Sequence, residues 1–171
     1  MPDSILVVYA TTYGSTQEVA ETIATTLRES GATVVCQPMK QVRSLEGYSA
    51  VVMGAPLYMF RWHKDAKSFL ARHRQALMAR RAAVFALGPF HVDAKEFTDA
   101  RGQLDKELLN FAWFKPVAIE IFGGKFDPAE LRFPYSLIPA LKKMPASDAR
   151  DWSAIRAWAS RLEPQLLSCS I

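Results

Sequence analysis

A run of hydroxyl residues around a single glycine has the composition of an anion-binding loop. The run is Thr11, Thr12, Tyr13, Gly14, Ser15 and Thr16. It follows an apolar stretch and precedes a segment with helical spacing, so unpaired N–H groups and the helix dipole would face a ligand. Gly14 removes a Cβ where the backbone must approach that ligand, and the hydroxyls add donors. Because the loop contains no Lys or Arg, it suits a bound cofactor phosphate better than phosphoryl transfer. A simple helix cap is the alternative.

Two further segments combine turn residues with aromatic side chains. The first contains Ala55, Pro56, Leu57, Tyr58 and Met59, and the second contains Gly88, Pro89 and Phe90. Each follows an apolar stretch, and in an open parallel sheet ligands bind beyond the carboxyl ends of the strands. Tyr58, Trp62 and Phe90 are flat groups that can sandwich an aromatic ring system. A phosphate tail joined to a planar head describes flavin mononucleotide (FMN), whereas ordinary packing is the alternative for each aromatic residue taken singly.

The elements that must position these segments are expected to alternate between strands and helices. A continuous apolar run, typical of a buried parallel strand, occurs at residues 5–9, and further strands are predicted at 33–37, 48–54, 82–87 and 117–122. Helical spacing of apolar residues occurs at 19–27, 66–77, 97–111 and 152–162. The alternation predicts an α/β fold, a three-layer sandwich with a five-stranded parallel sheet. We expect a single domain over residues 1–171, with an insertion near 125–147 that is apolar but interrupted by prolines.

Length, composition and charge narrow the class of protein. The chain has 171 residues, of which 50% are hydrophobic and 22% are charged, which is ordinary for a globular domain. No signal peptide and no apolar run long enough to span a bilayer is visible in the sequence, so we expect a cytoplasmic protein. Cys36 and Cys169 lie far apart and form no CxxC pair, as expected in a reducing compartment. The net charge is +4.

Other ligands of this fold class lack their signature residues in this chain. Only Gly14 is present where a dinucleotide-binding fold needs GxGxxG, and no P-loop pattern GxxxxGK[ST] occurs. A phosphorelay receiver needs carboxylates at the ends of its first and third strands, where this chain has Ala10-Thr11 and Gly54-Ala55. The basic runs Arg72-His73-Arg74 and Arg80-Arg81 have no aromatic residues among them, which nucleic-acid binding would favour, so no nucleic-acid partner is expected.

The three histidines show no spacing to Cys or carboxylates that would suit a metal, so no metal site is expected. His73 falls on the apolar stripe of its helix, which indicates a packed or capping residue. His63 and His91 lie beside the aromatic segments, where either can assist proton transfer at a flavin or remain solvated. The sequence assigns no catalytic acid or base.

The chain resembles the flavodoxin family, and the likeness covers nearly all of it. Residues 11–16 are similar to the family's T/S-x-T/Y-G-x-T phosphate motif. The chain also looks like the branch that contains the menaquinone-dependent protoporphyrinogen oxidase. That likeness includes Gly54 to Tyr58, the insertion, and the segment from Asp148 to Ile155. The resemblance implies that residues 11–16 hold the FMN phosphate and that residues 55–59 and the loop from Gly88 line the isoalloxazine ring.

The resemblance further implies an FMN-dependent oxidoreductase that dehydrogenates a porphyrinogen and passes the electrons to a quinone. The alternative is a small electron-transfer flavodoxin that serves a protein partner. A third interpretation is a module that has lost FMN and acts by protein association. Shuttle flavodoxins are typically acidic, whereas this chain has a pI near 9.2, which favours anionic lipid or a carboxylated substrate. The insertion would then rest on the inner face of a membrane or shape a substrate pocket, or else cover the edge of the sheet.

Overall fold

The computed structural model describes residues 4–58 and 61–168 of the chain. Its main strands are β1 (Ser4–Tyr9), β2 (Thr33–Pro38), β3 (Ala50–Tyr58), β5 (Arg81–Leu87) and β6 (Ala118–Phe122). Three strands have two residues each, namely β4 (Arg61–Trp62), β7 (Lys125–Phe126) and β8 (Ser147–Asp148). The helices are α1 (Ser15–Glu29), α2 (Lys64–Arg72), α3 (Arg74–Met78), α4 (Ala94–Leu109), α5 (Pro139–Lys142) and α6 (Trp152–Leu167). Short 3₁₀ turns occur at Met39–Gln41, Pro128–Glu130 and Tyr135–Leu137.

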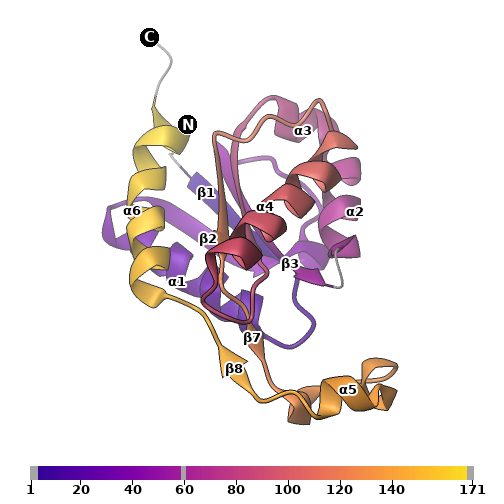
Figure 1. The fold of residues 1–171 in the computed structure, drawn as a ribbon. Coiled ribbons are helices and arrows are strands. Elements are labelled where there is room, and N and C mark those ends of the chain that lie inside the picture. Colours follow the sequence, from indigo (N-terminus) through magenta and orange to yellow (C-terminus); the bar gives the residue numbers. More distant parts are fainter. Residues whose placement is uncertain (1–3, 59–60, 169–171) are drawn as a thin grey trace.

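The main strands form one parallel sheet in the order β2-β1-β3-β5-β6, with β4 added antiparallel to the end of β3. The order reverses at β1, because the chain moves outward to β2 and then returns past β1 to β3. Helices cover both faces of this sheet (Figure 1). The predicted three-layer α/β sandwich is therefore confirmed.

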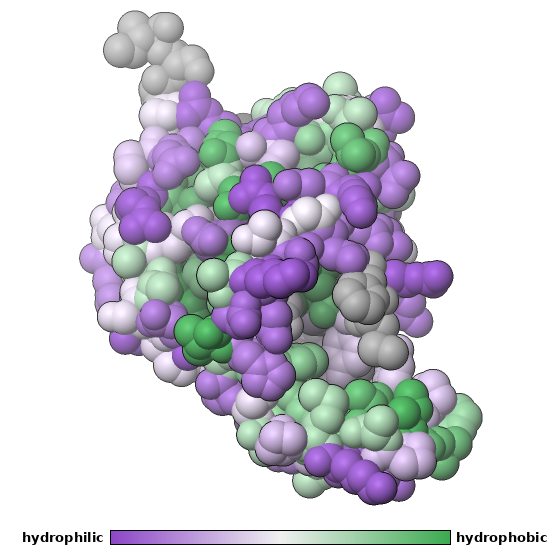
Figure 2. All heavy atoms as spheres, in the orientation of Figure 1, coloured by the Kyte–Doolittle hydropathy of each residue, from purple (hydrophilic) through white to green (hydrophobic). Residues whose placement is uncertain are grey.

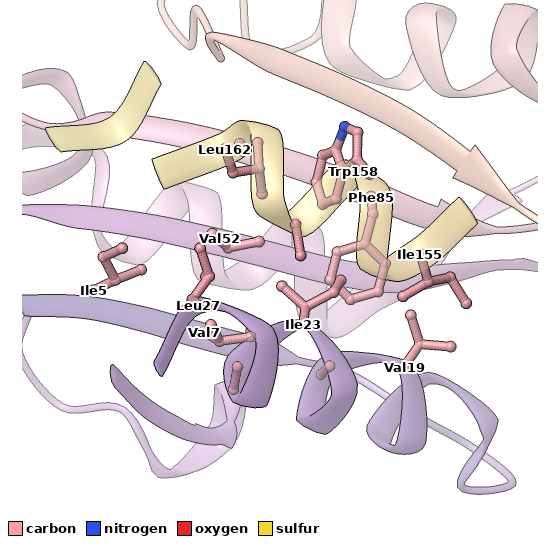
Figure 3. Packing of buried hydrophobic residues seen from close by; sticks show 14 of the residues in the cluster. Ile5, Val7, Val19, Ile23, Leu27, Val52, Phe85, Ile155, Trp158 and Leu162 are labelled. Atoms are coloured by element: carbon pink, nitrogen blue, oxygen red, sulfur yellow. The ribbon is translucent and has the colours of Figure 1, made fainter. Parts of the chain in front are cut away.

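One face of the sheet is covered by α1 and α6. All six residues of β1 are buried, which explains its uninterrupted apolar sequence. Its alternate side chains Ile5 and Val7 point to this face and meet Val19, Ile23 and Leu27 of α1 (Figure 3). Residues of α6 complete the cluster around Phe85, and they include Ile155, Trp158 and Leu162. This packing fixes α1, and therefore its first turn, against the carboxyl end of β1.

The other face is covered by α2, α3 and α4. Leu6 and Val8 of β1 point to it and share a core with Phe69 of α2 and Leu104 of α4. The apolar stripe predicted as one helix over 66–77 is divided into α2 and α3 at His73, whose backbone leaves the helical conformation. His73 is buried and its ring lies 4.7 Å from that of Phe69, centroid to centroid, so it is the packed residue that its position indicated.

Residues 128–146, here called the arm, extend away from the sandwich beyond β7 (Figure 1). The two strands β7 and β8 pair antiparallel and form the base of the arm. The arm itself consists of α5 and two 3₁₀ turns joined by irregular chain. None of its residues is buried.

The segment after Gly54 differs from the predicted connection. Residues 55–58 continue β3 in register with β5, up to the pair Pro56 and Leu87. The chain then returns as β4, with Leu57 opposite Trp62 and Tyr58 opposite Arg61. The expected loop is therefore largely a β-hairpin. Because side chains alternate between the two faces of a strand, its aromatic residues do not all point in one direction.

Candidate functional site

The candidate site is a pocket at the carboxyl edge of the sheet, where the ends of β1, β3 and β5 meet. The strand order reverses at this edge, which is where ligands of doubly wound sheets bind. The lining residues come from the β1–α1 turn, the ends of β3 and β5, and the β6–β7 turn. They are Thr11, Thr12, Tyr13, Ser15, Thr16, Pro56, Leu57, Tyr58, Leu87, Gly88, Phe90, Gly124 and Lys125.

The β1–α1 turn presents an uncapped helix start. Gly14 is the N-cap of α1 and has φ +89°, a conformation that side chains with a Cβ rarely adopt. Its N–H donates to Thr11 Oγ1 at 2.8 Å, which holds the turn in place. A Cβ at Gly14 would meet no atom within 4 Å, so it is the backbone angle that requires glycine in this structure. Because glycine offers no side-chain cap, the first N–H groups of α1 face the pocket unpaired by a side chain.

Thr16 supplies a buried hydroxyl at the same position. The residue is 0% exposed, and its Oγ1 has no hydrogen-bond partner among the described residues. A buried hydroxyl without a partner is costly, so it calls for an explanation such as a ligand or a water that completes the bonding. Four buried side-chain atoms of the described residues lack a partner, and of these the hydroxyls of Tyr13 and Thr16 belong to residues that line the pocket, whereas Trp62 and His73 lie in the core. The arrangement fits a phosphate at the start of α1, which would accept from the Thr16 hydroxyl and from the helix N–H groups.

Two cations lie outside the hydroxyl run, and sequence reasoning did not place them at the site. Lys125 of β7 lines the pocket, and the Arg132 guanidinium of the arm lies 5.9 Å from the centroid of the Tyr13 ring. Both come from segments more than 100 positions along the chain from the loop that they approach. No local pattern in the sequence signals this proximity, because it depends on how the β7–β8 ribbon folds back.

The second predicted segment contributes three of its five residues to the pocket. Pro56, Leu57 and Tyr58 line the pocket, whereas Ala55, a residue of the same strand, is fully buried in the core. Met59, predicted with them, lies outside the described residues. Trp62, expected to sandwich a flavin, is 1% exposed and packs in the core under α2 and α4, so that expectation is wrong. Trp62 lies opposite Leu57 in the hairpin, and its side chain belongs to the core on that face of the sheet.

The third segment is held by the chain beyond β6. The Gly88 N–H donates to the Phe122 carbonyl at 3.1 Å, and the Gly124 N–H donates to the Pro89 carbonyl at 2.6 Å. Gly88 and Phe90 line the pocket, and the Phe90 ring lies 5.3 Å from that of Phe126. Pro89 lines an adjoining apolar hollow of about 370 Å³, which shares Leu57, Gly88 and Phe90 with the pocket.

Tyrosine rings occupy the middle of the pocket. Tyr58 lies between Tyr13 at 6.1 Å and Tyr135 of the arm at 5.5 Å, centroid to centroid. Burial, followed by the neighbouring Tyr13, raises the pKa of Tyr58 well above its usual range, so its phenol stays protonated. The cavity between these rings is only about 20 Å³. A planar ring system therefore fits by parting Tyr13 from Tyr58 or by extending into the adjoining hollow, and a phosphate that reaches the buried Thr16 hydroxyl also needs the pocket to widen.

The histidines near the pocket are engaged in local structure. His63 is the N-cap of α2, and its Nδ1 accepts the Asp65 N–H at 3.1 Å. Burial lowers the pKa of His63, so its neutral form is favoured. His91 Nδ1 lies 3.1 Å from Glu96 Oε1, and both residues line the adjoining hollow. Among the described residues, no three His, Cys, Asp or Glu side chains gather into a group that could hold a metal ion.

The strand order β2-β1-β3-β5-β6 is that of the flavodoxin-like class of doubly wound α/β folds. The chain belongs to this family: the model for the flavodoxin domain matches residues 6–148. No protein of curated function matches the sequence significantly.

Solved flavodoxin structures share the fold at low sequence identity. Oxidised flavodoxin 1 from Bacillus cereus is 17% identical, with a TM-score of 0.61, over 97% of this chain and 100% of that one. A mutant of the flavodoxin from Pseudomonas aeruginosa is 14% identical, with a TM-score of 0.60, over 95% and 98%. Oxidised flavodoxin 2 from Bacillus cereus is 22% identical, with a TM-score of 0.52, over 69% and 83%. Identities this low speak for the fold alone.

Proposed function

We propose that this protein binds FMN noncovalently and serves as a flavodoxin-type electron-transfer protein for a redox partner. The observation that carries the proposal is the unpartnered, fully buried Thr16 hydroxyl at the uncapped start of α1. Membership of the flavodoxin domain family supports FMN as the anion's source. Bound FMN would supply the electron-transfer chemistry, and the protein would orient it and tune its surroundings.

The residues of the pocket would divide the work of binding. Ser15, Thr16 and the first N–H groups of α1 would hold the phosphate, and Lys125 would add a positive charge nearby. Leu57, Tyr58 and Phe90 would contact the ring system and exclude water from it. The hydrogen bonds that tie residues 88–90 to the β6–β7 turn would keep that wall rigid. The protonated Tyr58 phenol remains a hydrogen-bond donor throughout the physiological pH range.

A second candidate is the quinone-linked oxidoreductase of the protoporphyrinogen oxidase-like branch. The specific observation that favours it is the arm, which places Arg132 and Tyr135 against the tyrosines of the pocket. An arm at the mouth of a cofactor pocket would select a small substrate, whereas a shuttle protein needs its cofactor edge open to a protein. The positive charge of the chain also suits a carboxylated substrate.

Three measurements test the proposal in order. The purified protein should be yellow, and the stripped protein should regain flavin absorbance with FMN far better than with riboflavin, which lacks the phosphate. A colourless protein that binds neither compound would contradict FMN binding. For the FMN-loaded protein, reduction by a flavodoxin reductase and turnover of a porphyrinogen with menaquinone are then compared. Fast reduction without porphyrinogen turnover supports the electron-transfer role, and the reverse result supports the oxidoreductase.

A further inference from the structure

The arm is rich in large apolar residues that the protein covers only in part. These residues are Leu131, Phe133, Tyr135, Leu137, Ile138, Leu141 and Met144. None is buried, and Phe133 and Leu137 are 78% and 66% exposed. Globular proteins rarely leave such residues together on one projecting segment, unless that segment meets a partner or a membrane.

The charges of the arm are almost all positive. Residues 131–146 contain Arg132, Lys142 and Lys143 and no acidic residue, and Glu130 is the arm's one carboxylate. All three cations are exposed. Figure 2 shows the apolar side chains gathered over the end of the arm, with a hydrophilic band along its outer edge. Apolar groups flanked by Lys and Arg are the pattern of segments that lie in a membrane interface.

We propose that the arm docks this protein on an anionic lipid surface. Phe133, Leu137 and Ile138 would enter the boundary between headgroups and acyl chains, and Lys142 and Lys143 would contact lipid phosphates. The attachment is peripheral. Among the described residues, no helix combines the length and apolar composition needed to cross a membrane.

Charge argues for lipid rather than a second copy of this chain. An interface between two arms would bring Arg132, Lys142 and Lys143 of each copy against the same cations of the other, with only Glu130 to offset them. A lipid surface with anionic headgroups supplies the opposite charge over its whole area. A lipid surface also accepts the apolar side chains of the arm without needing a groove that matches their shape.

Docking by the arm would place the candidate cofactor pocket close to the membrane. Arg132 and Tyr135 of the arm contact Tyr13 and Tyr58 of the pocket, so the docking surface and the mouth of the pocket share one segment. A redox partner dissolved in lipid or bound to its surface would then be within reach. The docking proposal does not depend on the proposed redox function, because binding to vesicles can be measured without turnover.

The test is cosedimentation of the full-length protein with vesicles of phosphatidylcholine alone or with 30% phosphatidylglycerol, at low and high salt. The wild type should bind the anionic vesicles, and binding should weaken at high salt. Lys142→Gln with Lys143→Gln should weaken binding about 10- to 30-fold. Phe133→Ser with Leu137→Ser should weaken it about tenfold or more. All four positions are exposed, so circular dichroism and thermal unfolding should be unchanged.

Matched controls lie elsewhere on the surface. Lys106→Gln with Lys115→Gln removes the same charge, and Leu109→Ser removes a side chain that is 75% exposed at the end of α4. Both controls should bind vesicles like the wild type. No binding to anionic vesicles, or equal losses in arm and control variants, would overturn the proposal. A dimer in sedimentation analysis that the Phe133 and Leu137 changes abolish, without vesicle binding, would identify a second copy as the occupant and would also overturn it.

Discussion

The ring of Phe85 lies directly over the backbone of Gly54, its neighbour across the central sheet. The two residues are in register between β5 and β3. A Cβ added at Gly54 would lie 1.9 Å from Phe85 Cζ, far inside any real contact. Phe85 also meets Phe122 and Trp158, so this glycine makes room for the aromatic centre of the core under α6.

We expect Gly54→Ala to lower the free energy of unfolding by about 1–3 kcal/mol, because the Phe85 ring must leave its position. Urea unfolding followed by circular dichroism measures the change. Gly102→Ala is the control, since a Cβ there meets no atom within 4 Å and its site is within α4. That variant should be unchanged or more stable by about 0.5–1 kcal/mol.

Combining Gly54→Ala with Phe85→Leu separates crowding from a general backbone effect. If the ring is the cause, the double variant should cost less than the sum of the two single changes, because the smaller side chain no longer meets the added Cβ. Strict additivity of the two losses would mean that Gly54 is needed for another reason.

Much of the fold was predictable because it depends on local patterns. The unbroken apolar run of β1 is set by burial on both faces, and the helical spacing in α1 is set by its single apolar face. The hairpin of β3 and β4 was missed because Pro56 resembles a strand stop. Pairing of β3 with β1 ends at Gly54, so no β1 residue needs a donor from Pro56, and the strand continues through the proline beside β5.

The site was predictable where it is local and not where it depends on tertiary contacts. Residues 11–16 are contiguous, so their type and order were enough to place them together at the carboxyl end of β1 and the start of α1. That an anion binds there stays a prediction. Lys125 and Arg132 come near these residues only through the β7–β8 ribbon and the arm, and Ala55 lies outside the pocket because its small side chain is enclosed by the core. The flavin assignment of these residues stays a prediction.

Thr16→Val should separate phosphate binding from folding. The side chains have nearly the same shape, and the Thr16 hydroxyl makes no internal hydrogen bond, so the unliganded protein should be as stable as the wild type or slightly more so. FMN should bind about 10- to 150-fold more weakly, as expected for loss of one hydrogen bond to a charged group. Fluorescence titration with FMN and with riboflavin measures both affinities.

Riboflavin is the control ligand for this variant, because it carries no phosphate. Its affinity should be nearly the same for the wild type and Thr16→Val. Equal losses for the two ligands would show that Thr16 acts on the ring or on the fold rather than on the phosphate.

Arg150 links the start of α1 to the arm's base and the start of α6. Its side chain is 5% exposed, and it pairs with Glu18 in α1 and Asp148 in β8. The guanidinium also lies 4.8 Å from the centroid of the Trp152 ring. The hydrogen bond from Arg150 holds the pKa of Asp148 below its usual range. Glu18 is in the first turn of α1, so its charge would oppose a phosphate there if Arg150 did not balance it.

We expect Arg150→Gln to lower the free energy of unfolding by about 1–2 kcal/mol, since both carboxylates are half exposed and solvent screens part of the loss. FMN affinity should also fall, because Glu18 is left unbalanced. Adding Glu18→Gln should restore FMN affinity without restoring stability. If the second change has no effect on FMN affinity, Arg150 acts through structure and not through the charge of Glu18.

His73 should make stability depend on pH near neutrality. Burial, followed by the charge of Arg72, lowers the pKa of His73 from its ordinary value of 6.5. The folded protein therefore favours the neutral ring, and protonation favours the unfolded chain. This stability contribution is complete above pH 6.5 and is lost as the pH falls through the lowered pKa. Between pH 7.5 and 5.5 we therefore expect the free energy of unfolding to fall, in part through protonation of His73 in the unfolded chain.

Urea unfolding at the two pH values measures this fall in four proteins: the wild type, His73→Gln, His63→Gln and the double variant. Glutamine does not titrate, so His73→Gln should have a lower free energy of unfolding at pH 7.5 but a smaller loss on acidification. The pKa of His63 is lowered by burial as well, so His63→Gln should remove a separate part of the pH dependence. The double variant should then show the smallest loss of the four proteins. If His73→Gln keeps the full pH dependence of the wild type, the buried ring between α2 and α3 is not the group that titrates.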